Sequence, residues 1–346
     1  MIETHVVNLT LPPDWHTQGW LSHLLYMSNG YVAEAFAFCA GASFWLASQK
    51  NESGKYFWRF LFILGVGYWL NATPFSLHYI LRASPLEHQQ MAQCDILQVI
   101  GYSSLIALFI FRWKCFQKIF PWLSGFIALV IFLITPLEWT TPIFRSLPTF
   151  FSMLLSPIPP AKFPLFPWMG YFFAGVSLMS FLGQSKNPQR FSKWVGLIAL
   201  AAPWLIFHVK DMNFTCPGTA GPFVEWYPSP GHSLFRLSGV VFIYCLFYLF
   251  NNPLKALSSK IRFFQISGQE SLQIYVSQTL ILYGLAIHWN LSQYTTPWMA
   301  PAIFILVSLF CFLLATTWHT FKKKFPHPAS ALIKVMVVAV GILFFV

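Results

Sequence analysis

The sequence has very little charge. Only 9% of its 346 residues are Asp, Glu, Lys or Arg, whereas 56% are hydrophobic and 19% are aromatic. That is too little charge to cover the surface of a water-soluble protein of this length. Acidic residues are especially few, at 10 against 21 Lys and Arg. These proportions exclude an ordinary soluble domain and predict an integral membrane protein.

Several common signatures are missing too. The six cysteines show no metal-site spacing, and no glycine-rich loop marks a phosphate site. We find no low-complexity tract and no secretory signal with a cleavage site. We therefore expect no metal and no tightly bound cofactor. Cys94 and Cys216 lie near the predicted outer face, and they are either disulfide partners or buried free thiols.

What the sequence does have is a row of ten apolar segments, each of about the 20 residues that a bilayer crossing needs. They predict an all-α fold, a polytopic membrane bundle of about ten transmembrane helices. The segments cover 31–48, 57–75, 94–111, 119–136, 163–183, 194–209, 234–250, 270–288, 297–318 and 329–346.

Most Lys and Arg residues fall in five connectors on one side of these segments, which the positive-inside rule assigns to the cytoplasm. These cations are Lys50, Lys55, Arg59, Arg112, Lys114, Lys118, Lys186, Arg190, Lys193, Lys255, Lys260, Arg262, Lys322, Lys323 and Lys324. Their position at membrane boundaries explains the net charge of +11 without a nucleic-acid partner. We predict an extracytoplasmic segment 1–30, one transmembrane domain 31–346 and an extracytoplasmic C-terminus. The short loops favour a bacterial inner membrane.

The histidines follow the opposite distribution, since most of the ten lie on or near the predicted outer side. The segment 1–30 is the richest, with His5, His16 and His23. A neutral imidazole can accept a proton from an attacking hydroxyl or amine and can itself be acylated. Two interpretations of this segment stay open: group transfer, or anchoring of a membrane border by interfacial His and Trp.

Two carboxylates lie at the predicted outer ends of spans. Glu34 is within the first span and Asp95 is at the start of the third. An intramembrane carboxylate costs on the order of a few kcal/mol unless it is paired, and it usually faces the bundle interior. Arg236, at the outer start of the seventh span, is the nearest candidate counter-ion. The alternative is an ion pair that ties helices together without chemistry.

Four segments together carry a resemblance. They are AEAFAFCAG at 33–41, DILQVIG at 95–101, FPLFPWMG at 163–170 and GQESLQIY at 268–275, the last with Glu270 in a first helical turn, where the helix dipole favours a carboxylate. In this order they resemble the heparan-alpha-glucosaminide N-acetyltransferase catalytic domain and its bacterial relatives. The first segment is also similar to the membrane protein of periplasmic glucan succinylation.

The resemblance implies that an acyl group passes from cytoplasmic acyl-CoA to an acceptor on the far side, through a His just ahead of the family's second helix. The spacing fits His23 best and His16 next, while His5 matches a family position at the outer end of the first helix. Two departures from the family pattern stand out. Residues 1–5 read like the last turn of the family's first helix, so either the start of the chain is misassigned or truncated, or this member has lost a helix. Gln278 stands where the family often has a His.

We therefore expect a membrane-bound acyltransferase that lies in the lipid bilayer. Its donor substrate would be acetyl-CoA or another acyl-CoA, and its acceptor would be an extracytoplasmic glycan. The protein could form a homodimer. His23 or His16 would act as acyl shuttle or general base, supported by His5. The substrate-binding residues would be Glu34, Asp95, Gln98, Trp168 and Arg236. In this scheme the carboxylates of Glu34 and Asp95 orient an imidazole or the acceptor, and Arg236 balances their charge. Trp168 lines the outer opening of the site.

Two other classes compete with this one. A transporter or flippase for a glycan or lipid-linked sugar would use the same polar residues to line a path, although the sequence shows no convincing internal repeat. A non-catalytic relative of an acyltransferase would keep the fold and lose the chemistry.

Overall fold

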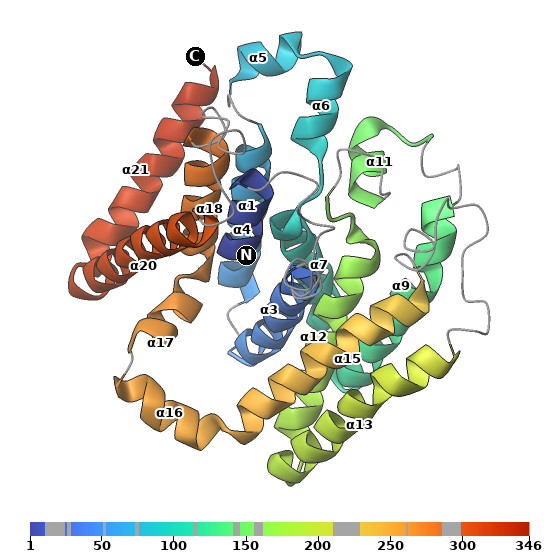
Figure 1. Ribbon diagram of the computed structural model, residues 1–346. Coiled ribbons are helices and arrows are strands. Elements are labelled where there is room, and N and C mark those ends of the chain that lie inside the picture. The colour runs from blue at the N-terminus through green and yellow to red at the C-terminus, as the bar shows by residue number, and fades with distance from the viewer. Residues whose placement is uncertain are drawn as a thin grey trace. The chain divides into compact units, whose positions relative to one another are not determined.

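The computed structural model describes residues 1–10, 25, 29–50, 53–72, 76–113, 117–140, 146–155, 162–209, 229–260, 262–285 and 299–345. Every regular element within these ranges is a helix (Figure 1). The predicted all-α fold is therefore confirmed. The chain divides into two compact units. Unit 1 comprises Met1–Asn29, Pro74–Arg82 and Asn251–Val346, and unit 2 comprises Gly30–Thr73 and Ala83–Phe250.

Each of the ten predicted apolar segments coincides with a helix or, for the eighth, with two consecutive helical pieces. Among the described residues, four helices are long and apolar enough to cross a bilayer: Phe120–Leu137, Leu165–Gln184, Pro230–Leu249 and Met299–Lys324. A fifth is added if α6 (Pro85–Ala92) and α7 (Ile96–Arg112), bent by 56° at their break, form one span. The chain is thus an integral membrane protein, and the number of ten crossings stays a prediction.

The centre of unit 2 is the contact between α3 (Val32–Ser48) and α12 (Leu165–Gln184). A Cβ atom on Gly41 would collide with the carbonyl oxygen of Phe172, and one on Gly175 would collide with that of Phe38. Small residues at membrane helix interfaces allow backbones to approach in this way. The two glycines therefore set how closely α3 and α12 pack.

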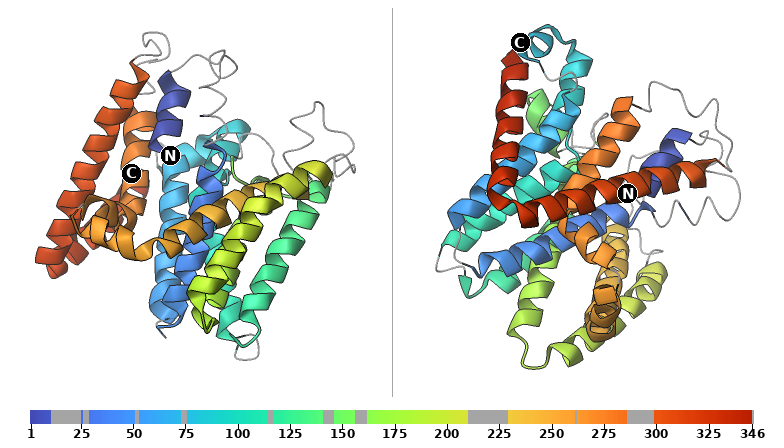
Figure 2. Two further views of the ribbon diagram at one scale, coloured as in Figure 1. Left: turned by 60° about the horizontal axis from the view of Figure 1, so that its bottom comes forward. Right: turned by 90° about the vertical axis from the view of Figure 1, so that its left-hand side faces the viewer.

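The other helices of unit 2 pack around this pair (Figure 1, Figure 2). α9 (Phe120–Thr140) packs on α12, α4 (Ser53–Asn71) packs on α7, and α13 (Pro188–Val209) runs beside α15 (Pro230–Leu249). The short α11 (Thr149–Leu155) lies against α6. Cys94, just before α7, is a buried free thiol, while Cys216 lies outside the described residues.

Unit 1 is built on α1 (Ile2–Thr10), α18 (Ser271–Thr279) and α20 (Ala300–Lys324). α18 continues directly into η3 (Leu280–Leu285), a single π-helical stretch. Val6 of α1, Leu282 of η3, and Val307 and Cys311 of α20 form its buried core. The remaining helices of the unit are α5 (Leu77–Arg82), α16 (Asn251–Lys260), α17 (Arg262–Gln269) and α21 (Pro326–Phe345).

One helix end differs clearly from the prediction. The ninth apolar segment was expected to end at residue 318, but α20 continues to Lys324. A hydropathy window ends at the first polar residues, whereas lysine is a good helix former. Lys322, Lys323 and Lys324 therefore occupy the last turn of a helix, where the helix dipole favours cations.

The glycine contact between α3 and α12 can be tested by adding a methyl group. We expect Gly41→Ala and Gly175→Ala each to lower the stability of the purified protein by about 1–3 kcal/mol, because the new Cβ must push the helices apart. Gly65→Ala in α4 is the matched control, because its Cβ would meet no atom within 4 Å. Thermal unfolding in one detergent compares the three, and equal behaviour of all three would contradict the packing described above.

Candidate functional site

A buried polar cluster lies where the first turns of α3 and α15 meet in unit 2. We call it the α3–α15 cluster, and it consists of Tyr31, Glu34, His232 and Arg236. Glu34 is 4% exposed, and His232 and Arg236 are each 6% exposed. Buried charged groups need partners, so the contacts of each side chain decide what the cluster can do.

The start of α15 holds two of these residues on one helical face. Ser229 caps the helix by accepting a hydrogen bond from the backbone N–H of His232, at 3.1 Å, and Pro230 occupies the first turn. His232 and Arg236 are four residues apart and therefore neighbours on the helix surface. Arg236 Nε donates to His232 Nε2, at 3.3 Å, which requires a lone pair on that nitrogen. The contact therefore fits a neutral imidazole protonated on Nδ1.

Two glycines make room for the arginine and the tyrosine. The guanidinium of Arg236 lies over the ring of Tyr31, 4.6 Å from its centroid. A Cβ atom on Gly30 would collide with the guanidinium, and one on Gly239 would press on the Tyr31 ring. A desolvated cation–π contact of this kind contributes on the order of 2 kcal/mol. The arginine is thus enclosed by the start of α3 as well as by its own helix.

Glu34 is the incompletely bonded member of the cluster. Glu34 lies in the first turn of α3, and Arg236 lies over Tyr31 at the start of that helix, so both predicted site residues belong to this cluster. Glu34 Oε2 is nevertheless buried without a hydrogen-bond partner among the described residues. A buried carboxylate oxygen is costly to leave unbonded. It is therefore suited to accept a hydrogen bond from a hydroxyl or amine that enters the site.

Asp95 and Gln98 form a capping box at the start of α7. The Asp95 side chain accepts from the N–H of Ile96, at 2.6 Å, and Gln98 Oε1 accepts from the N–H of Asp95, at 3.2 Å. Asp95 therefore places its charge at the positive end of a helix. Gln98 is fully buried beside Gly67, and its Nε2 has no hydrogen-bond partner in the described part of the chain.

Trp168 is held in the protein interior. The backbone N–H groups of Lys162 and Phe163 donate to the carbonyl oxygen of Cys94, at 3.3 and 3.1 Å, which ties the segment before α12 to the start of α7. Phe163 packs edge-on against the indole, with ring centroids 5.3 Å apart. Trp168 is only 2% exposed. Its face is therefore covered by protein here and not open to a sugar ring, which differs from the outer wall expected from the sequence.

Of the three predicted catalytic histidines, only His5 can be placed. His16 and His23 lie outside the described residues. His5 belongs to unit 1, where its Nδ1 is 2.8 Å from the hydroxyl of Tyr283. Its ring meets the tyrosine ring edge-on, with centroids 5.2 Å apart.

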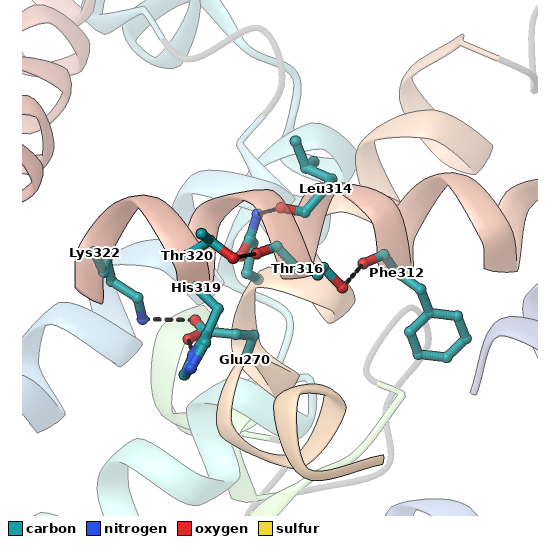
Figure 3. Close-up of polar contacts among 8 residues, drawn as sticks. Glu270, Phe312, Leu314, Thr316, His319, Thr320 and Lys322 are labelled. Atoms are coloured by element: carbon teal, nitrogen blue, oxygen red, sulfur yellow. Dashed lines mark hydrogen bonds and ion pairs between the residues drawn. The ribbon is translucent and has the colours of Figure 1, made fainter. Parts of the chain in front are cut away.

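Unit 1 also contains a buried ion cluster (Figure 3). Glu270, 5% exposed, bonds His319 Nδ1 through Oε1, at 2.9 Å, and Lys322 Nζ through Oε2, at 2.7 Å. Glu270 precedes the first turn of α18 but makes no side-chain cap there. At this position the carboxylate still lies at the positive end of the helix dipole. Its bonds to His319 and Lys322 in addition hold the start of α18 against α20.

Sequence reasoning missed His232, His319 and Lys322 as partners of buried charges. The four-residue spacing of His232 and Arg236 behind Ser229-Pro230 was a readable signal. No local signal connects Glu270 with α20, because the two segments are far apart in the chain. Among the described residues, no group of three or more His, Cys, Asp or Glu side chains could hold a metal ion.

A model of the family "Heparan-alpha-glucosaminide N-acetyltransferase, catalytic" matches residues 1–211, more than half of the chain. The chain belongs to this family. Membership of the heparan-alpha-glucosaminide N-acetyltransferase catalytic family indicates an acetyltransferase-type membrane enzyme. Glu34, Asp95, Gln98 and Trp168 fall within the matched region, whereas Arg236 lies beyond it. No curated protein and no solved structure matches the chain.

The contact of Arg236 with Tyr31 predicts coupling between two substitutions. Arg236→Gln should lower the stability of the folded protein by about 2 kcal/mol, because it removes a desolvated cation–π contact. Tyr31→Leu should then cost less in the Arg236→Gln protein than in the unmodified one, with a coupling of about 0.5–3 kcal/mol. Thermal unfolding of the four proteins of this cycle measures the coupling. Arg190→Gln, at an exposed position of α13, serves as the control, and strictly additive losses would argue against the contact.

Proposed function

We propose that this protein is an integral membrane acyltransferase that moves an acetyl or other short acyl group from cytoplasmic acyl-CoA to an extracytoplasmic glycan. The observation that carries the proposal is the α3–α15 cluster, where a buried oxygen of Glu34 has no hydrogen-bond partner among the described residues and Arg236 lies over Tyr31 at the start of the same helix. Such a site suits an acceptor rich in hydroxyl or amine donors. The family supplies the acyl chemistry.

In the proposed reaction, His23 or His16 is the acyl shuttle or the general base. As a shuttle, its imidazole nitrogen attacks the thioester carbonyl, the carbon–sulfur bond breaks, and the CoA thiolate takes the imidazole proton. An acceptor hydroxyl or amine then attacks the acyl-imidazole and restores the histidine. As a base, the same imidazole removes the proton of the acceptor while the acceptor attacks the thioester directly. His5 supports either route.

The binding roles follow from the contacts in unit 2. Glu34 Oε2 accepts a hydrogen bond from the acceptor, and Arg236 balances the charge of that carboxylate. Asp95 and Gln98 hold the start of α7, and the amide of Gln98 offers a buried donor. Trp168 contributes by fixing the segment that opens α12. Orienting the acceptor in a site that excludes water favours transfer over hydrolysis.

The proposal places the cation-rich connectors in the cytoplasm and the C-terminus outside, in a bacterial inner membrane. The position of Lys322, Lys323 and Lys324 in the last turn of α20 is consistent with an inner boundary at that helix end. Acyl-CoA acts as a substrate in this scheme and not as a resident cofactor.

A labelling experiment tests the proposal. Detergent-purified protein incubated with radiolabelled acetyl-CoA, without acceptor, should retain label if a histidine shuttles the acyl group. Replacement of the shuttle residue, by His23→Ala or His16→Ala, should abolish retention, because the nitrogen that carries the acyl group is removed. His327→Ala, at an exposed position of α21, should retain label like the unmodified protein.

Other outcomes of the same assay separate the alternatives. Label retained in a variant with His5, His16 and His23 all changed to Ala would contradict the histidine mechanism. Movement of a glycan across proteoliposomes without acyl-CoA would favour the transporter. Acyl transfer to a glycan without labelled protein would favour the general-base route.

A further inference from the structure

We propose that the corner between α20 and α21 binds the headgroup of an anionic phospholipid through Lys323, Lys324 and Lys334. The two helices meet there with only Phe325 between them (Figure 1, Figure 2). All of these residues belong to unit 1. Binding of such a lipid requires no acyl transfer and is therefore independent of the proposed reaction.

The end of α20 lies at the level of the lipid headgroups. The 26 residues from Met299 to Lys324 form one candidate membrane span. They extend over about 39 Å, whereas the hydrocarbon core of a bilayer is about 30 Å thick. Trp318 stacks on Phe321 near this end of the helix, with ring centroids 5.8 Å apart, and tryptophan concentrates at membrane interfaces. The last turn of α20 therefore extends past the hydrocarbon.

Only one lysine of this turn is neutralised by a described carboxylate. Lys322 Nζ lies 2.7 Å from Glu270 Oε2, and His319 bonds the other carboxylate oxygen (Figure 3). These two bonds form a clamp between the start of α18 and α20. Lys323 and Lys324 are exposed, and neither forms an ion pair with a described residue. Consecutive side chains of an α-helix point about 100° apart, so the clamp leaves these two lysines directed away from Glu270.

Lys334 is an isolated charge on the other side of the corner. It lies in α21, 8 residues beyond Pro326 and thus about 12 Å along the helix axis. All the other residues from 331 to 338 are apolar and exposed. A cation in an apolar membrane helix is costly and needs a partner. Helical side chains lean toward the N-terminus of their helix, and lysine can extend its ammonium group to the membrane boundary. Lys334 therefore reaches back toward the corner.

The sequence around the corner contains no acidic residue. Residues 271–346 include four lysines and neither Asp nor Glu. The acidic residues that the structure describes in unit 1 are Glu3 and Glu270, and Glu270 is already bonded to two side chains. Neither glutamate forms an ion pair with Lys323, Lys324 or Lys334. This excess of cations favours an anion from outside the chain.

An anionic phospholipid matches both the charge and the surroundings of the corner. Its phosphate oxygens accept hydrogen bonds from lysine ammonium groups, and such charged hydrogen bonds are the stronger ones. Its acyl chains can cover exposed apolar side chains of α21, among them Leu332 and Val335. Lysine clusters at the end of a transmembrane helix attract anionic lipids. A soluble phosphate would make the charge contacts alone.

Lipid titration of the purified chain tests the inference. Protein in a neutral detergent is titrated with dioleoylphosphatidylglycerol or dioleoylphosphatidylcholine, and native mass spectrometry measures the bound lipid. The anionic lipid should bind more tightly, although the acyl chains are identical. Lys323→Gln with Lys324→Gln, and Lys334→Gln alone, should weaken its binding about fivefold for each lysine removed. Lys323→Arg with Lys324→Arg should retain the binding, because the charge is kept.

The matched control is Lys186→Gln with Arg190→Gln, which removes two exposed cations near the start of α13. It should leave the affinity for phosphatidylglycerol unchanged. Equal affinity for the two lipids would overturn the inference, and so would an equal weakening by the control. Displacement of the bound lipid by an equal concentration of inorganic phosphate would also overturn it, because the corner would then bind a soluble anion.

Discussion

The close approach of α3 and α12 is the constraint on which unit 2 depends. Gly41 and Gly175 bring the two backbones into direct contact, and α12 also reaches α15 through Tyr171, whose hydroxyl donates to the carbonyl oxygen of Ser233 at 3.3 Å. α12 therefore positions the first turns of both α3 and α15. Glu34 lies in the first turn of α3, and Arg236 lies in the second turn of α15, from which its guanidinium reaches Tyr31 at the start of α3.

The two buried glutamates show two ways of holding a carboxylate in an apolar bundle. Glu270 has a partner for each oxygen, His319 and Lys322, so its role is satisfied within the protein. Glu34 has an arginine nearby but keeps one oxygen without a partner among the described residues. A fully bonded carboxylate stabilises a helix contact, whereas an incompletely bonded one retains capacity for a ligand. Of the two side chains, Glu34 is therefore the one that can accept a further hydrogen bond from a ligand.

Hydropathy predicted the helices well because an apolar stretch in a membrane must satisfy its own backbone. The cost of intramembrane charge also predicts that Glu34 faces the bundle interior with Arg236 as its candidate counter-ion, and both side chains are buried. The role of Asp95 was less readable, because a helix cap and an intramembrane carboxylate look alike in sequence. Trp168 was expected at the outer opening of the site, but it packs against Phe163 in the interior. Phe163 is held there by a hydrogen bond from its backbone N–H to the carbonyl oxygen of Cys94. A contact between residues so far apart in the sequence cannot be predicted from residue spacing.

The clamp on Glu270 has a consequence for the length of α20. The same helix contributes Cys311 to the core of unit 1 and His319 to the clamp, so these two contacts are separated by a fixed number of residues. Inserting one residue between them would rotate one contact relative to the other by about 100° and shift it by about 1.5 Å. The number of residues between Cys311 and His319 in α20 therefore fixes the relative position of the two contacts. Insertions and deletions are tolerated only outside this part of the helix.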